Sequence, residues 1–108
     1  MNKYRTHSCS ELSALNLNEQ VILSGWVDTI RDHGNLIFID LRDNYGITQC
    51  VVDATHQSFN DISNLSHESV ITIKGQVIER SAETINKTIT TGEIEIKIQS
   101  FNLLSSSD

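Results

Sequence analysis

The sequence lacks the cysteine framework that holds many small secreted domains together. Its 108 residues include two cysteines and no proline, and aromatic residues make up only 6%. Two cysteines do not provide the several disulfides on which such domains depend. Cys50 lies within an apolar run, so we expect it to be a small buried hydrophobic residue.

Long apolar runs are also missing. No segment approaches the roughly 18 apolar residues of a membrane-spanning helix. The opening stretch MNKYRTHSCSEL has no apolar centre of the kind found in signal peptides. We therefore expect a cytoplasmic protein with no membrane partner. With 38% hydrophobic and 20% charged residues, the chain has the composition of one small globular domain.

Positive charge is scarce. Eight lysines and arginines face 14 aspartates and glutamates, which gives a net charge of −6. A protein that binds nucleic acid by neutralising many phosphates needs a basic patch, and this balance argues against one. A module that reads a few unpaired bases by stacking and hydrogen bonding remains compatible with it.

Signals of catalysis are absent. The sequence has no nucleophile motif, no glycine-rich phosphate loop and no paired-carboxylate signature. His7 and Cys9 are too few for a metal site, and His56 and His67 fall outside any metal-ligand spacing. We expect no catalytic residue, no metal site and no cofactor within these 108 residues.

The alternation of apolar and polar residues predicts five strands, at 20–30, 35–42, 47–53, 69–79 and 93–99. Between the third and fourth strands, Phe59, Ile62 and Leu65 lie three apart, which predicts a short amphipathic helix within 53–65. Three strands, a helix and two strands are typical of an all-β chain folded as a five-stranded Greek-key barrel, the OB-fold.

Shorter signals add detail to this barrel. Ser8 and Glu11 have the spacing of a capping box, which predicts a short N-terminal helical turn. Gly25 inside the first strand predicts a bulge or a close backbone approach at a barrel corner. The polar stretch 80–92 predicts a long hairpin loop. An OB-fold carries its ligand on an open face near the second and third strands and this loop.

The stretch NLIFIDLRD, residues 35–43, has an unexpected aromatic residue. One face of the predicted strand, formed by Ile37, Ile39 and Leu41, is aliphatic and is expected to face the core. The other face carries Phe38 beside Asp40 and Arg42. Phe38 has two interpretations of equal weight: a second small hydrophobic patch under the N-terminal segment, or a platform on which an unpaired base stacks. Stacking of this kind contributes roughly 1–3 kcal/mol per base.

Side chains that could hydrogen-bond a base edge accompany Phe38. Arg31 lies in the turn before its strand, and Gln49 lies in the next strand. On the last strand, Ile94, Ile96 and Ile98 are expected to face inward, and Glu93 and Glu95 are expected on the exposed outward face. Arginine and glutamine can each make two hydrogen bonds to a base, and a carboxylate can accept from an amino group.

Several motifs together point to a family. The segments YRTHSCSEL, VILSGWV, RDHGNLIFIDLRDNYGITQCVVD, IKGQVIER and TGEIEI closely resemble, in order and spacing, the N-terminal domain of bacterial aspartyl-tRNA synthetase. In that family the domain is an OB-fold that binds the tRNA anticodon. The resemblance implies that residues 1–104 form this domain and that 105–108 begin a linker to a missing catalytic domain.

The resemblance also implies roles for individual residues. Phe38 matches the aromatic residue that stacks on the middle anticodon base, a uridine, and Gln49 matches the glutamine that reads it. Arg31 matches the arginine beside the third base. The remaining matches are a base-reading glutamate, Glu95 with Glu93 close by, and two loop residues, Arg80 and Asn86.

Two positions bear on which tRNA is accepted. His33 resembles enzymes that charge both aspartate and asparagine tRNAs, and Thr84 is not the asparagine of the rejecting type. The partners implied are tRNA(Asp) and, under relaxed specificity, tRNA(Asn). The family usually has two or three consecutive basic residues before DHG, whereas here Asp28-Thr29-Ile30-Arg31 keeps only one.

For the full-length enzyme the resemblance implies an ATP-dependent class II aspartate–tRNA ligase that uses ATP and Mg2+ and is a homodimer. The present chain would not be catalytic by itself and could be a monomer. Two alternatives stay open at this point: a general single-stranded nucleic-acid-binding OB module and a protein-interaction module.

Overall fold

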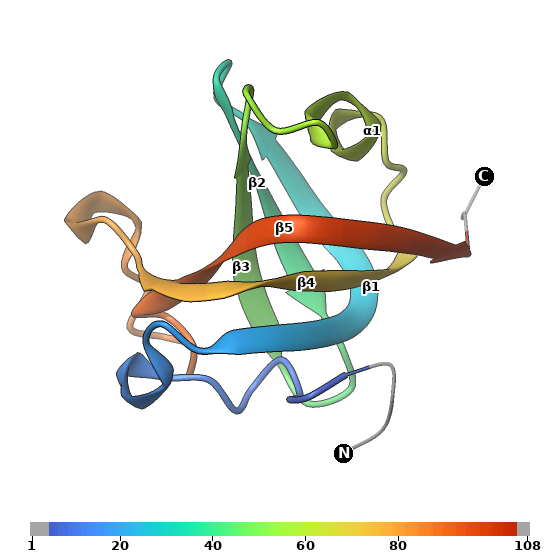
Figure 1. Ribbon diagram of the computed structural model, residues 1–108. Helices are drawn as coiled ribbons and strands as arrows, with labels where there is room; N and C mark the ends of the chain where they lie inside the picture. Colours follow the sequence, from blue (N-terminus) through green and yellow to red (C-terminus); the bar gives the residue numbers. More distant parts are fainter. Residues whose placement is uncertain (1–4, 106–108) are drawn as a thin grey trace.

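The structure, a computed structural model, describes residues 5–105 (Figure 1). The strands in chain order are β1 (Gln20–Asp32), β2 (Leu36–Arg42), β3 (Ile47–Asp53), β4 (Val70–Glu79) and β5 (Ile94–Ser105). One short helix, α1 (Phe59–Ser63), lies between β3 and β4, as the sequence predicts. Two single-turn 3-10 helices, η1 (Ala14–Asn16) and η2 (Ala82–Thr84), complete the described elements.

The five strands close into a barrel in the order β1-β2-β3-β5-β4, with β4 paired back to β1. All pairs are antiparallel except β3 with β5, which pair in parallel through Cys50–Ile96 and Val51–Lys97. The predicted all-β, five-stranded Greek-key barrel is confirmed.

Strand β1 belongs to both sides of the barrel because it bends sharply (Figure 1). Its first half, Gln20 to Trp26, pairs with β4, and its second half, Trp26 to Asp32, pairs with β2. At the bend, a Cβ atom on Gly25 would lie 2.2 Å from the carbonyl oxygen of Arg42. The predicted close approach at Gly25 is confirmed, and the register shift follows it, between Val27 and Thr29.

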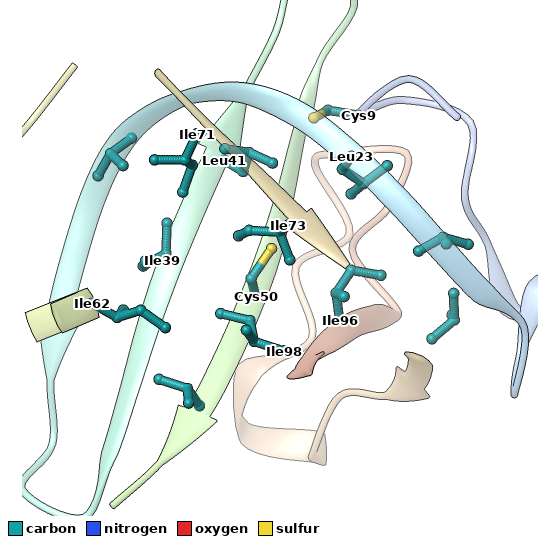
Figure 2. Packing of buried hydrophobic residues seen from close by; sticks show 14 of the residues in the cluster. Cys9, Leu23, Ile39, Leu41, Cys50, Ile62, Ile71, Ile73, Ile96 and Ile98 are labelled. Atoms are coloured by element: carbon teal, nitrogen blue, oxygen red, sulfur yellow. The ribbon is translucent and has the colours of Figure 1, made fainter. Parts of the chain in front are cut away.

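The core is mainly aliphatic, and its side chains pack together inside the barrel (Figure 2). The inward faces expected of β2 and β5 are confirmed, since Ile37, Ile39 and Leu41 and also Ile94, Ile96 and Ile98 are buried. Cys50 is fully buried among them, as predicted. Ile62 from α1 and Leu12 from the N-terminal segment are likewise buried in this cluster.

The N-terminal helical turn is not where the sequence predicts it. The backbone N–H of Ser8 does donate to Glu11 Oε1 at 2.7 Å, but a turn without a helix follows. The reason is tertiary: Cys9 N–H donates to Asp43 Oδ2, and Cys9 C=O accepts from Thr48 Oγ1, both at 2.8 Å. The helical turn forms later, at η1.

The ends of two strands also differ from the prediction. Strand β1 continues to Asp32, so Arg31 lies in a strand and not in a turn. Strand β5 continues to Ser105 because its second half keeps pairing with β4. Ser105, where the linker is expected to begin, is the last residue of β5, and 106–108 lie outside the described residues. Within residues 5–105, no helix is long and apolar enough to cross a membrane.

Replacing Gly25 by alanine should destabilise the barrel by about 1–3 kcal/mol, because the new methyl group overlaps the Arg42 carbonyl. Urea denaturation measures this loss. Gly34→Asn is the matched control: Gly34 has φ +81° with nothing within 4 Å of an added Cβ, and asparagine tolerates this conformation. Equal losses for the two variants would contradict the close approach.

Candidate functional site

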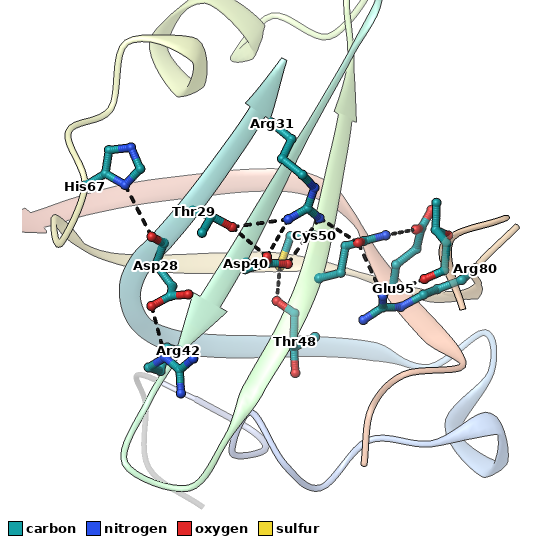
Figure 3. Close-up of polar contacts among 12 residues, drawn as sticks. Asp28, Thr29, Arg31, Asp40, Arg42, Thr48, Cys50, His67, Arg80 and Glu95 are labelled. Atoms are coloured by element: carbon teal, nitrogen blue, oxygen red, sulfur yellow. Dashed lines mark hydrogen bonds and ion pairs between the residues drawn. The ribbon is translucent and has the colours of Figure 1, made fainter. Parts of the chain in front are cut away.

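Polar side chains from β1, β2, β3 and β5 and from the loop after β4 meet on the outer wall of the barrel (Figure 3). Strand register brings Arg31, Asp40 and Gln49 together. Asp40 of β2 lies opposite Gln49 of β3 and close to Arg31 at the end of β1. Arg80 follows β4, and Glu95 lies on β5. Four of the predicted site residues, namely Arg31, Gln49, Arg80 and Glu95, are thus joined in one hydrogen-bonded network.

Arg31 is held by a two-point ion pair. Its Nη1 donates to Asp40 Oδ2 at 2.5 Å, and its Nη2 donates to Asp40 Oδ1 at 3.3 Å. Thr29 supports the same carboxylate, since its hydroxyl donates to Asp40 Oδ2 at 2.6 Å. Paired guanidinium–carboxylate bonds of this kind fix direction as well as distance. Arg31 therefore enters the site with its head already oriented.

Gln49 lies at the centre of the network and is only 3% exposed. Its Oε1 accepts from Arg31 Nη2 at 2.7 Å and from Arg80 Nη1 at 3.3 Å. Its Nε2 donates to Glu95 Oε1 at 2.7 Å. The side chain predicted to read a base is thus tied to three charged partners.

Arg80 is buried at the start of the long loop and braces it. Its Nε donates to the carbonyl oxygen of Ile94 at 2.8 Å, and its Nη1 donates to that of Thr84 at 2.9 Å. Burial lowers the pKa of Arg80, and the nearby carboxylates Asp40 and Glu95 oppose this effect. Arg80 Nη2 has no hydrogen-bond partner among the described residues. Every buried side-chain nitrogen in that part of the chain is hydrogen-bonded, so Nη2 must be accessible to solvent.

Glu95 differs from its expected exposure. It lies on the outward side of β5, as predicted, but is only 8% exposed, and Gln49 and Arg80 lie next to its carboxylate. Burial raises the pKa of the Glu95 carboxyl, and the Gln49 hydrogen bond and the charge of Arg80 oppose this increase. The carboxylate therefore belongs to the interior of the network.

A cavity of about 360 Å³ opens beside the network. The long loop forms one wall and places the predicted residues Thr84 and Asn86 there, together with Ile89. The lining residues are Arg31, Asp40, Arg42, Ile47, Gln49, Arg80, Thr84, Asn86 and Ile89. Three arginines and one carboxylate line this cavity. Two further carboxylates lie next to these arginines, since Asp28 pairs with Arg42 and Glu95 is close to Arg80, so the cluster is rich in donors but balanced in charge.

Phe38 stands at the edge of the site and is half-buried. The Cζ atom of Arg31 lies over its ring, 5.9 Å from the centroid, and the ring of His33 meets it edge-on with centroids 5.3 Å apart. The N-terminal segment does not cover it in residues 5–17, because Cys9 hydrogen-bonds at the opposite end of β2, to Asp43. The interpretation of a patch under that segment is therefore not supported.

Glu93 does not join the network. It is exposed and lines a neighbouring hollow of about 390 Å³ under the long loop, together with Ile85, Asn86, Lys87, Ile89 and Thr90. The structure therefore separates the two glutamates that the sequence placed together. One is built into the network, and the other faces solvent beside the second hollow.

Sequence reasoning did not select Asp40 or Arg42 as site residues. Asp40 organises Arg31, and Arg42 lines the cavity while it pairs with Asp28 at 3.1 Å. The sequence could have indicated both residues, because the alternation of β2 places Asp40 and Arg42 on the same face as Phe38. Within residues 5–105, no group of three or more His, Cys, Asp or Glu side chains could hold a metal ion.

A model of the tRNA anti-codon family, described as an OB-fold nucleic acid binding domain, matches residues 21–104. The chain belongs to this OB-fold family. The matched span runs from β1 to β5 and contains every residue of the network described above.

Relatives of this OB-fold domain are much longer proteins. The aspartate–tRNA(Asp/Asn) ligase of Pelagibacter ubique is 58% identical over 96% of this chain, and that of Rickettsia africae is 52% identical over the whole chain. The chain spans 18% of the length of each.

Solved structures show the same OB-fold. The asparaginyl-tRNA synthetase of Pyrococcus horikoshii is 25% identical, with a TM-score of 0.78 over 94% of this chain and 23% of that one. A putative aspartyl-tRNA synthetase of Leishmania major, 21% identical, has a TM-score of 0.81 over 99% of this chain and 22% of its own.

Because burial raises the pKa of Glu95, the folded state holds this proton more tightly than the unfolded chain does. The free energy of unfolding should therefore fall as pH rises above the ordinary carboxyl value of 4.5. Glu95→Gln keeps an acceptor for Gln49 and removes this loss. We expect the variant to gain stability relative to the unchanged protein between about pH 4 and about pH 7, measured by urea denaturation.

Glu93→Gln is the matched control, since it removes one negative charge from the exposed neighbour. A gain of equal size for Glu93→Gln would show that net charge, and not burial of Glu95, is responsible.

Proposed function

We propose that this chain is the anticodon-binding domain of an aspartate–tRNA ligase. One observation carries the proposal: the half-exposed ring of Phe38 lies against the guanidinium of Arg31, which is hydrogen-bonded to Gln49 and lines a cavity with it. An aromatic surface beside oriented donors is the arrangement that single-stranded RNA modules use to stack a base and read its edge. The family and the names of the relatives support the same assignment.

In this proposal the domain recognises and does not catalyse. Phe38 stacks on the middle base of the loop, Gln49 reads that base, and Arg31 lies beside the next one. Thr84, Asn86 and the exposed Glu93 supply polar contacts from the loop side. The rest of such a ligase, which works in the cytoplasm as a homodimer, would supply the ATP and Mg2+ chemistry.

Charge supports recognition of a few bases over bulk phosphate binding. The family arginines before DHG are reduced to Arg31, but the fold brings Arg42 and Arg80 to the same cavity from β2 and the long loop. Three arginines at one point offer hydrogen-bond donors to an RNA loop, while Asp40, Asp28 and Glu95 balance their charge. Affinity in this proposal depends on stacking and hydrogen bonds, and salt weakens it only modestly.

Relaxed tRNA specificity is a further part of the proposal. His33 meets the edge of the Phe38 ring, and Thr84 lies on the cavity wall. Both positions therefore border the bases that would be read, and the relatives are named for both tRNAs. The full-length enzyme should charge purified tRNA(Asp) and tRNA(Asn); strict rejection of the asparagine tRNA would contradict this part alone.

Titration of the domain with two labelled RNA hairpins at low salt tests the proposed function. One hairpin carries the loop triplet GUC, and in the other the middle U is replaced by A. A clear preference for GUC supports anticodon reading. Equal binding with a steep dependence on salt would point instead to a non-specific single-strand binder, and binding to neither hairpin would contradict the proposal.

Phe38→Ala should weaken binding to the GUC hairpin by roughly 1–3 kcal/mol, because the stacking surface is removed. Phe38→Trp keeps such a surface and should retain most of the affinity. Leu103→Ala, an exposed apolar residue far along β5, is the control for a general loss of hydrophobic surface. Unchanged affinity of Phe38→Ala would remove the stacking claim.

A further inference from the structure

The remaining hydrogen-bonding capacity of Gln49 can be counted. A side-chain amide has two acceptor positions on oxygen and two N–H donors on nitrogen. Arg31 and Arg80 occupy both acceptor positions of Oε1, and Glu95 occupies one donor of Nε2. One N–H is left. Whatever Gln49 reads, it can offer that ligand a single donor and no acceptor.

The orientation of this amide is imposed by its neighbours. Two guanidinium groups, which only donate, lie on one side of Gln49, and a carboxylate lies on the other. The reversed amide would place its NH2 group against Arg31 and Arg80 and its oxygen against Glu95. Both contacts would be repulsive at 3% exposure, where an unsatisfied polar group costs most.

Asp40 is the residue that keeps this arrangement in place without touching Gln49 in any hydrogen bond. Arg31 makes the shorter of the two bonds to Gln49, at 2.7 Å against 3.3 Å for Arg80. Both terminal nitrogens of Arg31 are bound to Asp40, which Thr29 supports in turn. Without the carboxylate, Arg31 loses the ion pair that directs its Nη2 to Gln49.

We propose that Asp40 is a positioning residue for base selection: through Arg31 it holds the Gln49 amide so that a single N–H faces the ligand. The inference rests on the proposed anticodon function. A lone donor favours a base with a hydrogen-bond acceptor at that point. Uracil has a carbonyl oxygen at position 4, whereas cytosine has an amino group there and would bring two donors together.

The test compares hairpins with the loops GUC and GCC, which differ by this one exchange of acceptor for donor. The unchanged domain should bind GUC about tenfold or more tightly than GCC, as expected for one satisfied against one unsatisfied hydrogen bond. Asp40→Asn keeps the shape of the side chain and removes its charge. It should reduce the ratio of the two affinities to about threefold or less.

Asp28→Asn is the matched control. Asp28 pairs with Arg42, which also lines the cavity, and it makes no hydrogen bond to the Gln49 network. The same charge is removed next to the same cavity, so the affinities for both loops should change together and their ratio should stay as before. A purely structural role of Asp40 would likewise lower both affinities without changing the ratio.

A second variant covers the case in which Asp40→Asn does not fold. In the double variant Gln49→Glu with Glu95→Gln, the new carboxylate keeps both arginine bonds and accepts from the new amide at residue 95. The net charge stays the same, but the group left for the ligand is now an acceptor. The preference should shift toward GCC.

The outcomes separate the two claims. Equal binding of GUC and GCC by the unchanged domain, together with equal binding of GUC and the loop with A, overturns the proposed function. Preference for GUC that survives Asp40→Asn overturns the role of Asp40 and leaves the proposed function standing. If the double variant still prefers GUC over GCC, the claim that Gln49 offers the ligand one donor and no acceptor is wrong.

Discussion

The site depends on one buried amide. Gln49 can stay at 3% exposure on the outer wall of a small barrel only because Arg31, Arg80 and Glu95 satisfy it from three different elements. Each of these partners is costly to bury alone, and together they satisfy one another. The same contacts join the end of β1, the start of the long loop and the last strand to β3. A polar network of this kind holds the side chains of the candidate site in fixed positions.

The protein combines an acidic composition with a local cluster of arginines. The net charge of −6 describes the whole surface, whereas the cavity is lined by Arg31, Arg42 and Arg80, whose nearby carboxylates are Asp40, Asp28 and Glu95. Ionic screening limits long-range attraction to about 10 Å at ordinary salt, so a compact cluster can act locally without making the whole protein basic. This separation suits a module that must read a few bases while the remainder of a larger assembly holds the RNA.

Most of the fold could be predicted from the sequence because strands with one buried face have a strict two-residue period. Ile37, Ile39 and Leu41 are predicted to face inward, and the structure confirms that they are buried.

The predictions that were wrong or incomplete concern residues whose position depends on contacts between distant segments. Asp43 and Thr48 keep Cys9 out of the helical turn that Ser8 and Glu11 predict. Glu95 has the pattern of an exposed residue but is buried beside Gln49 of β3 and Arg80, which are distant in the sequence. Asp40 was on the predicted face, but its link to Arg31 follows from strand register, which local sequence does not specify.

Chemical-shift mapping of the isotope-labelled domain with an unlabelled GUC hairpin tests the central claim most directly, because it shows which face of the barrel meets the RNA. The account predicts that the largest changes cluster at Phe38, at the side chains of Arg31 and Gln49, and along the loop around Asn86. Residues at the far end of β5, such as Leu103, should shift little. Changes centred on β5 and α1, with the Gln49 side-chain amide unmoved, would contradict the account.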